Sequence, residues 1–391
     1  KPEIASFRHI SNEFRYFQGP DSLAAMPREL VRAGCKRAML ICAGSVARNA
    51  GLMNKIEAAL GDLCCGIFSD VRPHSPVPSV QAAAAELKAS GADSVIAVGG
   101  GSAMVTARAA IILLAENKPV DELCTYVADD GRIISPRLSA PKLPQFVVPT
   151  TPTSAIVKAG SAVFDPERNR RCALYDPKTR AAAVFVDPEM IGSAPDSLVH
   201  SAGLDTFVLA FEALLANRAD SISDALLLHV LRLTVEAFAP PFSHGDLEVR
   251  AQLTSAAVMC GRGTDNLSAG IATALGHAIA NFCEADNGIT KFILLPHVLA
   301  FNSEAANSTI PKIAFSLTGR AGSEADAGAI QDVLEQIASE LKLPRRLRDI
   351  GVPQDILSAA SLNAMDDWWI RGNPRRVQDA SELEEILTAA W

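Results

Sequence analysis

The segment Asp93-Ser-Val-Ile-Ala-Val-Gly-Gly-Gly-Ser-Ala-Met-Val-Thr-Ala-Arg108 decides the fold of this chain. Its first part, residues 94–98, is an apolar run without polar alternation, which is typical of a strand buried on both faces of a sheet. Three consecutive glycines follow, and residues 102–116 then have the composition of a helix. The sequence therefore predicts a strand, a turn without side chains and a helix in direct succession.

The predicted turn has the properties of a phosphate-binding site. Bare backbone N–H groups and the positive end of a helix dipole would converge on one point. The alternative is a tight turn that needs glycine only for its backbone, but three consecutive glycines exceed that requirement. We predict that the cofactor-binding residues of this turn are Gly99, Gly100, Gly101 and Ser102.

Strands and helices alternate on both sides of this turn. Apolar runs predict strands at residues 37–42, 64–71 and 145–148. A helix at 21–33 precedes the first of them, and a helix at 79–90 follows the second. This alternation predicts a parallel sheet with helices on both faces, which binds ligands at the carboxyl ends of its strands. We also expect residues 159–164 and 181–186 to form a pair of strands around a polar loop.

Hydroxyl side chains follow the strand at residues 145–148, in the sequence Pro149-Thr-Thr-Pro-Thr-Ser154. At the carboxyl end of a strand, Thr150 and Thr151 could reach a phosphate or a ribose. A Ser/Thr-rich turn without a ligand is the alternative that this segment alone leaves open.

The pattern changes after Asp187-Pro188, where helical periodicity replaces the strand pattern. The sequence predicts helices at residues 197–217, 222–238, 247–260, 269–283 and 290–302, and more helix at 311–341, before residues 353–391 complete the chain. We therefore expect an α/β dinucleotide-binding domain at residues 1–187, with a Rossmann-like parallel sheet, and an all-helical domain at residues 188–391.

Composition and charge narrow the function classes. The 391 residues are 49% hydrophobic with a net charge of −8. The longest basic run is Pro344-Arg-Arg-Leu-Arg348, which argues against a nucleic-acid surface. Apolar runs fall short of a membrane span, and the first 30 residues lack a charged-then-apolar leader. Eight cysteines without a CxxC pair favour apolar fillers in a reducing cytoplasm, with a metal cluster as the alternative. We expect a cytoplasmic protein.

Several motifs together resemble the iron-containing alcohol dehydrogenase family and its maleylacetate reductase branch, along essentially the whole chain. They are the glycine turn, Pro149-Thr-Thr151, Val186-Asp-Pro188, Ala202-Gly-Leu-Asp205 and Leu295-Pro-His-Val-Leu-Ala-Phe-Asn302. The resemblance implies a dehydroquinate synthase-like fold and hydride transfer between a nicotinamide and an alcohol or carbonyl. It also implies a homodimer. Most members of the family hold iron or zinc with one aspartate and three histidines.

The metal ligands are where this sequence departs from the family that it resembles. Asp205 matches the aspartate, but the three histidine positions are Leu209, Thr273 and Asn287. Leucine cannot coordinate a metal, and Thr and Asn are weak neutral oxygen donors, whereas iron and zinc prefer nitrogen-rich sites. We therefore expect no catalytic metal of the family type, although a remaining role of Asp205 in metal binding stays open.

Two further departures concern the cofactor. The family often carries Asp and Lys after its glycines, and these positions are Val105 and Arg108 here. Many members also have an aspartate at the end of the second strand, able to bind the ribose 2′-OH, and an approximate alignment gives Cys42. Without that carboxylate a 2′-phosphate is not repelled, so the sequence admits NAD or NADP.

Hydride transfer without a metal still requires a group that stabilises the negative substrate oxygen and a group that delivers a proton. His277 is the histidine that remains of the family's pair, and the alternative is a core histidine bound to a backbone carbonyl. Lys291, four residues after Asn287, is a candidate to replace the lost cation, and a solvated surface lysine is its alternative. Asp205 would orient a substrate hydroxyl or pair with a lysine.

The sequence thus predicts an NAD(P)H-dependent alcohol dehydrogenase or carbonyl reductase, with catalytic residues His277, Asp205 and Lys291. Its substrate would be a small alcohol, aldehyde or oxo acid. A maleylacetate reductase-like oxo-acid reductase is one alternative. A nucleotide-binding paralogue with lost or altered catalysis is another, because the glycine turn survives while three metal ligands do not.

Overall fold

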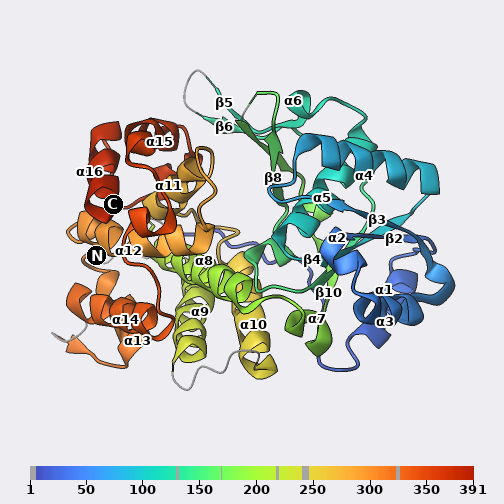
Figure 1. Ribbon diagram of the computed structural model, residues 1–391, viewed down its shortest axis with the longest axis horizontal. Coiled ribbons are helices and arrows are strands. Elements are labelled where there is room, and N and C mark those ends of the chain that lie inside the picture. The colour runs from blue at the N-terminus through green and yellow to red at the C-terminus, as the bar shows by residue number, and fades with distance from the viewer. Residues whose placement is uncertain (1–5, 129–131, 169, 217–219, 240–245, 323–325) are drawn as a thin grey trace. The chain divides into compact units, whose positions relative to one another are not determined.

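The computed structural model of this protein describes residues 6–128, 132–168, 170–216, 220–239, 246–322 and 326–391. The chain forms two compact units, which Figure 1 colours by residue number. One unit is Asn12–Ala194, and the other is Lys1–Ser11 together with Pro195–Trp391.

The first unit is organised around a parallel sheet of six strands. In spatial order these are β1 (Tyr16–Gln18), β10 (Ala181–Val186), β7 (Gln145–Pro149), β4 (Ser94–Gly99), β2 (Ala38–Ala43) and β3 (Cys64–Val71). Every neighbouring pair is parallel. The predicted parallel sheet is therefore confirmed, and the apolar run at residues 94–98 is one of its two central strands, with all side chains buried.

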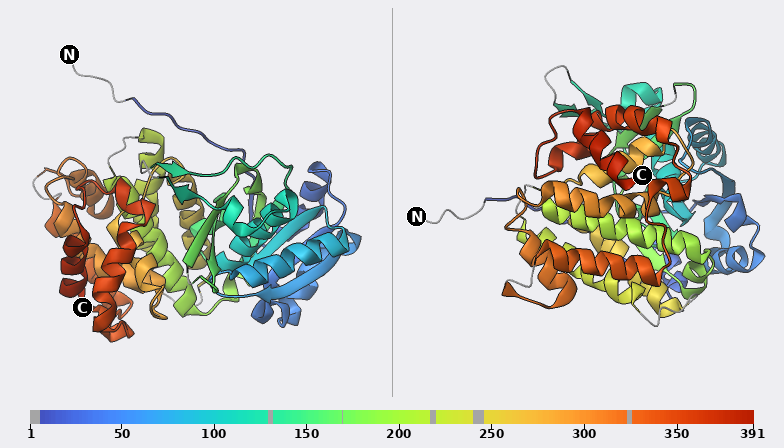
Figure 2. Two further views of the ribbon diagram at one scale, coloured as in Figure 1. Left: turned by 90° about the horizontal axis from the view of Figure 1, so that it is seen from above. Right: turned by 60° about the vertical axis from the view of Figure 1, so that its left-hand side comes forward.

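Helices cover both faces of this sheet, as Figure 2 shows. On one face, α1 (Met26–Arg32) and α3 (Ala50–Leu60) pack against alternate strand residues such as Leu40, Ile96 and Phe146. On the other, α4 (Val77–Ser90) packs on β3, and α5 (Gly101–Glu116) packs on β4 and β2. Because both faces are covered, the four inner strands β10, β7, β4 and β2 are almost wholly buried and mainly apolar rather than alternating.

One predicted strand pairing is wrong. Residues 160–165 form β8, but its antiparallel partner is β9 (Arg170–Tyr175), which lies in the segment expected to begin as a polar loop. The expected partner, β10, instead joins the main sheet between β1 and β7. The arginines of β9 hid its strand character, since Arg170 is exposed and pairs with Asp121 while Cys172 and Leu174 are buried.

The predicted helix from Ser79 begins two residues earlier, at Val77. Its cap position is Pro76, which presets the extended backbone that precedes a helix. The Ser79 hydroxyl does not cap the helix but donates to the backbone carbonyl of Asp70 at 2.6 Å. It thereby ties the start of α4 to the end of β3.

The second unit contains helices and no strand among its described residues. Its main helices are α8 (Asp196–Leu215), α9 (Ser221–Phe238), α10 (Leu247–Gly263), α11 (Ile271–Ile279), α12 (Asn287–Asn302), α13 (Ile310–Thr318), α14 (Ala327–Glu340), α15 (Leu357–Met365) and α16 (Ala380–Ala390). Helices α8, α9, α10 and α12 run side by side in the right-hand view of Figure 2. The predicted helix at 311–341 is two helices, because Gly319 ends α13 in the left-handed conformation. Residue 217, the predicted end of α8, lies outside the described residues.

Helix α8 corrects one expectation about membranes. By length and composition it is apolar enough to span a bilayer, although we expected no such stretch. Two thirds of its most apolar 18-residue stretch is buried inside the protein, where α8 packs against α9, α10 and α12. Its hydrophobicity is therefore explained by its central place in the helical unit.

Candidate functional site

The glycine turn lies where the sequence predicted it, between β4 and α5. Gly99 ends β4 with a φ of +139°, a backbone conformation that L side chains rarely adopt. Gly100 is the N-cap residue of α5, and Gly101 is its first helical residue. The N-terminus of a sixteen-residue helix thus opens at the carboxyl end of a central strand, which is the geometry that binds phosphate groups.

The threonine loop packs directly on this turn. β4 and β7 are neighbours in register, with Gly99 opposite Pro149, and the Thr150 N–H donates to the Gly99 carbonyl at 2.9 Å. A Cβ on Gly100 would lie only 2.9 Å from Oγ1 of Thr151. The structure therefore brings the predicted cofactor-binding residues together at one edge of the sheet, and the threonine hydroxyl explains why position 100 has no side chain.

Arg108 stabilises the segment that follows the threonine loop. Its side chain is fully buried, Nη1 donates to the Ala155 carbonyl at 2.7 Å, and Nε donates to Ser161 Oγ at 3.3 Å. Burial lowers the pKa of this guanidinium, and the nearby charge of Arg180 adds to the effect. Arg108 thus holds the segment that follows the threonines rather than contacting a ligand at the turn.

In the helical unit, α8, α11 and α12 pack together and assemble the second group of predicted residues. Asp205 lies on α8, His277 lies on α11, and α12 carries Asn287 and Lys291. Helix α12 approaches α8 very closely at Gly288, where a Cβ would overlap the Ser201 carbonyl. The cap residue before it, Asp286, accepts from the Ser201 hydroxyl at 2.7 Å.

Lys291 and Asp205 form an ion pair between these helices. The ammonium nitrogen of Lys291 lies 2.7 Å from Oδ1 of Asp205. The lysine side chain is 5% exposed and that of Asp205 is 28% exposed. Nδ2 of Asn287 lies 3.4 Å from the same carboxylate oxygen. The interpretation of Lys291 as a solvated surface lysine is therefore wrong, because its charge is buried against Asp205.

The charge of Lys291 also acts to lower the pKa values of two other acids, Glu212 and Asp367. Glu212 of α8 is fully buried, and burial raises its pKa, although donors from α11 and the charge of Lys291 oppose this shift. Its carboxylate accepts from the backbone N–H of Ala272 at 2.6 Å and from the Thr273 hydroxyl at 2.6 Å. Glu212 thus anchors the N-terminus of α11 through three hydrogen bonds that its carboxylate accepts.

His277 pairs with an acid that the sequence did not single out. Its Nδ1 lies 2.8 Å from Oδ2 of Asp367, in the loop that leads into the 3₁₀ helix Trp368–Gly372. Burial acts to raise the pKa of Asp367, but the hydrogen bond and charge of His277 outweigh it, so the pKa is lowered. The interpretation of His277 as a core histidine bound to a backbone carbonyl is wrong at Nδ1, because an ionised carboxylate accepts that hydrogen bond.

The four positions that hold a metal in the family do not form such a site here. Asp205 is occupied by an ammonium, and Leu209 offers no donor atom. The Thr273 hydroxyl donates to Glu212, and Asn287 turns its amide nitrogen toward Asp205. A divalent ion at this point would also meet the positive charge of Lys291. The residues present therefore do not fit iron or zinc, and we assign no chemical step to a metal.

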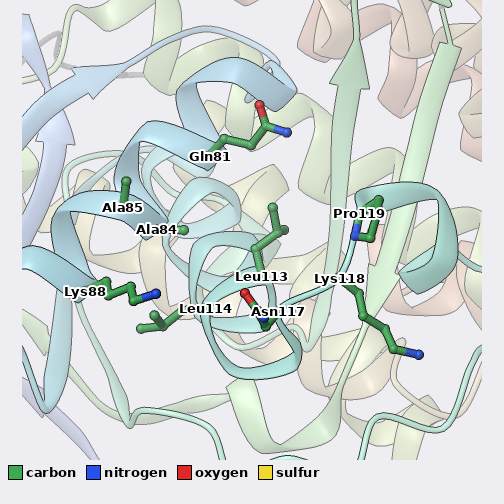
Figure 3. Close-up of a pocket in the computed structure, with 9 residues that line it drawn as sticks. All are labelled: Gln81, Ala84, Ala85, Lys88, Leu113, Leu114, Asn117, Lys118 and Pro119. Atoms are coloured by element: carbon green, nitrogen blue, oxygen red, sulfur yellow. The ribbon is translucent and has the colours of Figure 1, made fainter.

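Two other features of the described residues lie apart from the predicted sites. Asp121, Asp165 and Cys172 have potential ligand atoms within 4.8 Å of one another, but Arg168 and Arg170 already pair with the carboxylates. A groove of about 420 Å³ between the C-terminal ends of α4 and α5 has Lys88 and Lys118 among its lining residues (Figure 3). It contains none of the predicted site residues.

Sequence reasoning missed Glu212 and Asp367, and also missed two glycines, of which one makes room for the lysine and the other for the backbone of α8. A Cβ on Gly276 would lie 2.7 Å from Cγ of Lys291, and Gly288 allows α12 to touch α8. Glycine inside a helix is unfavourable without a packing reason, so these two residues were the available signal. No sequence pattern pointed to Glu212 or Asp367, because their partners Thr273 and His277 are 61 and 90 positions away in the sequence.

Comparisons with known proteins agree with the fold and the motifs. Residues 14–188 match the family model described as "Iron-containing alcohol dehydrogenase", and residues 199–391 match the C-terminal model of the same family. Lactaldehyde reductase of Escherichia coli (strain K12) is 27% identical over 98% of this chain and 99% of its own length. An NAD-dependent methanol dehydrogenase of Bacillus methanolicus is 23% identical over 93% of this chain and 96% of its own length.

A solved maleylacetate reductase of Agrobacterium tumefaciens has the same fold, with a TM-score of 0.78, 22% identity, and 99% of both chains covered. The two family models together span nearly the whole chain, and the predicted dehydrogenase motifs lie within them. The chain therefore belongs to the iron-containing alcohol dehydrogenase family and is an oxidoreductase.

Proposed function

We propose that this chain transfers a hydride between NAD(P)H and a small alcohol or carbonyl compound, without the divalent metal of its family. One observation carries the proposal, namely the 2.7 Å ion pair between Lys291 and Asp205 at the family's metal-ligand aspartate. In this proposal the covalently attached ammonium of Lys291 replaces the exchangeable metal ion of the family. Family membership supports the reaction class, and the ion pair supports the absence of a metal.

The glycine turn and threonine loop are the proposed dinucleotide site. The N–H groups at the start of α5 would bind the pyrophosphate, and the hydroxyls of Thr150 and Thr151 would orient the adjoining ribose. When bound, the nicotinamide ring is the hydride donor or acceptor. The curated methanol dehydrogenase relative is NAD-dependent by name, which supports a nicotinamide cofactor for this chain as well.

Lys291 is the proposed electrophile. Hydride addition to a carbonyl carbon places negative charge on the substrate oxygen, and a preorganised ammonium stabilises that charge most strongly where water is excluded. The lysine side chain is 5% exposed, and Asp205 fixes its position. The carboxylate of Asp205 accepts from the ammonium at 2.7 Å, and the charge of the ammonium also acts on the acids Glu212 and Asp367.

His277 is the proposed proton donor in the reductive direction. Asp367 accepts from Nδ1, so a second proton on the ring resides on Nε2, from which it can pass to an alkoxide. The carboxylate stabilises the imidazolium before transfer and orients the ring, as acids paired with catalytic histidines do. In the oxidative direction the neutral ring would accept the alcohol proton.

The substrate class is a small alcohol, aldehyde or oxo acid. An oxo acid would make the chain similar in activity to the maleylacetate reductases, whose fold it shares. The positive charge of Lys291 is compatible with a carboxylate-bearing substrate, although Asp205 already pairs with it. We also propose a cytoplasmic homodimer, as the sequence analysis predicted.

The test is an assay of nicotinamide absorbance over a panel of aldehydes and oxo acids, with and without a chelator, alongside metal analysis of the purified protein. We expect turnover that is insensitive to the chelator and to added iron or zinc. Lys291→Met should lower kcat/KM by about 100-fold or more, the effect of removing one oxyanion donor. Lys312→Met, which removes an exposed lysine of α13, is the matched control and should leave turnover unchanged.

Two results would contradict the proposal. Turnover that is lost with a chelator and restored by a divalent ion would return the metal to the mechanism. Full activity of Lys291→Met would remove the lysine from it. The second candidate function, a dinucleotide-binding paralogue without catalysis, is favoured by the loss of the ligands at Leu209, Thr273 and Asn287. Cofactor binding without turnover on any substrate of the panel would support this candidate.

A further inference from the structure

The end of β2 carries no carboxylate, although dinucleotide-binding folds often place an acid there for the ribose 2′-OH. Cys42, the residue expected at this point, is fully buried within the sheet and cannot reach a ligand. The strand ends at Ala43, and the short helix α2 (Gly44–Ala47) begins with a residue that has no side chain. The exposed position that follows is Ser45, which offers a hydroxyl.

The guanidinium of Arg48 fills the space beside Gly44. Arg48 is the C-cap residue of α2, and its backbone N–H donates to the Gly44 carbonyl at 3.1 Å. This single turn folds the side chain back, so that Nη1 lies 3.0 Å from where a Cβ on Gly44 would be. Arg48 is exposed, and the described residues give it no ion pair with a carboxylate. Its positive charge is therefore available at the end of β2.

The neighbouring strand does not cancel this charge. β3 lies beside β2 and carries Asp70 near its end, with Val71 opposite Ala43. The Asp70 carboxylate already accepts from Nε and Nη2 of Arg72, at 3.0 and 3.1 Å. The two arginines thus differ in state, since Arg72 is neutralised by Asp70 whereas Arg48 is not.

We infer that Arg48 binds the 2′-phosphate of NADP(H), with the Ser45 hydroxyl as a second donor, and that the chain prefers NADP(H) to NAD(H). The inference rests on the proposed function in one respect, namely that a dinucleotide binds along the carboxyl edge of the sheet. A guanidinium suits a phosphate because it offers paired N–H donors and a permanent charge. Replacement of an acid by a nearby arginine is the general way in which these folds accept a 2′-phosphate.

A substitution at Gly44 tests the role of Arg48 independently of a change in Arg48 itself. A side chain here would meet Nη1 of Arg48, the mobile end of a flexible side chain, so the backbone tolerates the change. An aspartate at this position would pair with Arg48 and face the ribose 2′-OH. Gly44→Asp should therefore convert a preference for the 2′-phosphate into a preference for the 2′-hydroxyl.

The experiment measures binding by titration calorimetry and does not require turnover. The ligands are NADPH, NADH, and the fragments 2′,5′-ADP and 5′-AMP, which lack the nicotinamide. The wild-type protein should bind NADPH and 2′,5′-ADP about 10- to 100-fold more tightly than NADH and 5′-AMP, the range of a charge-assisted contact. Arg48→Gln should remove this difference without weakening NADH, and Gly44→Asp should invert it.

Lys88→Gln is the matched control. It removes an exposed positive charge from the last turn of α4, which precedes the amino end of β4, and should change none of the four affinities. Thermal unfolding of each variant confirms that it is folded.

Four outcomes decide the inference. Equal affinities for NADH and NADPH in the wild-type protein would overturn it, as would equal losses for both cofactors in Arg48→Gln. Absence of binding by either dinucleotide would overturn it together with the proposed function. Tight, Arg48-dependent binding of NADPH without turnover would support the inference while the proposed function fails.

Discussion

The side chain of Lys291 occupies a space that exists because residue 276 is glycine. A Cβ at position 276 would lie 2.7 Å from Cγ and 2.9 Å from Cε of the lysine. The two residues come from neighbouring helices, α11 and α12, and the lysine stem lies along the helix that carries His277. The glycine therefore sets the position of the ammonium as directly as its ionic partner Asp205 does.

Gly276→Ala should move Lys291 away from Asp205 and lower kcat/KM by about tenfold or more, because the proposed electrophile is misplaced. Dinucleotide binding should be unchanged, since the glycine turn belongs to the other unit. Steady-state kinetics and calorimetry measure the two effects. Gly51→Ala, in α3, is the control, because its Cβ would make only an ordinary contact at 3.5 Å. Undiminished turnover of Gly276→Ala would contradict the proposed role of Lys291.

The ion pair of Lys291 and Asp205 should be detectable in the free energy of unfolding. Asp205→Asn leaves a buried ammonium without its charged partner and should cost about 2 kcal/mol, the size of a hydrogen bond between charged groups. Lys291→Met should cost less, because Asp205 retains partial access to water. The double variant should be more stable than the sum of the single effects implies, by about 1 kcal/mol. Urea unfolding of the four proteins gives this coupling, and additive effects would show that the pair contributes nothing.

Gly100→Ala should disrupt the proposed dinucleotide site. The new methyl group would lie 2.9 Å from Thr151 Oγ1, so the threonine side chain must rotate or the loop must shift. We expect dinucleotide affinity to fall about tenfold, with a small effect on the melting temperature. Calorimetric titration with NADPH tests this. Wild-type affinity in the variant would show that the contact between turn and threonine loop does not shape the site.

Asp367 should make stability depend on pH in a defined range. Its pKa is lowered in the folded protein, so it stabilises the fold above the ordinary carboxyl value of 3.8, and this contribution is lost as the pH falls below that value. Asp367→Asn should cost about 2 kcal/mol near neutral pH, the size of a hydrogen bond between charged groups. The difference between the two proteins should shrink in acid. A difference that does not change with pH would mean that the charge of Asp367 is irrelevant to stability.

Local patterns were sufficient to predict the sheet and its glycine turn. Residues 93–108 carry a β-branched run, a glycine triplet and a helical segment in sequence, so each part supports the same structure. The partner of β8 could not be predicted in this way. β9 begins with two arginines, of which Arg170 pairs with Asp121, and its buried positions are the alternate residues Cys172 and Leu174. Strand order depends on such long-range contacts more than on composition.

In the candidate site, too, single residues were predictable from local motifs, whereas some of their long-range contacts were not. Asp205, His277 and Lys291 were recognisable by motif and spacing, and the structure joins Asp205 to Lys291. The contact of His277 with Asp367 was not predictable, because it links residues 90 positions apart across the fold. Cys42 is fully buried in β2, and Ser45 is the first exposed residue after the strand. An approximate alignment could not reveal this difference in burial.

The ammonium of Lys291 is attached to the chain by covalent bonds and lies against α8 as soon as α12 packs there. If Lys291 is the electrophile, as we propose, every folded copy of the protein carries that cation in a stoichiometry of one, with no insertion step after synthesis. Such a cation cannot be oxidised by oxygen, exchanged for a competing ion or withdrawn when iron is scarce. On this view the protein would keep a constant specific activity across growth conditions that leave an iron-dependent relative partly empty.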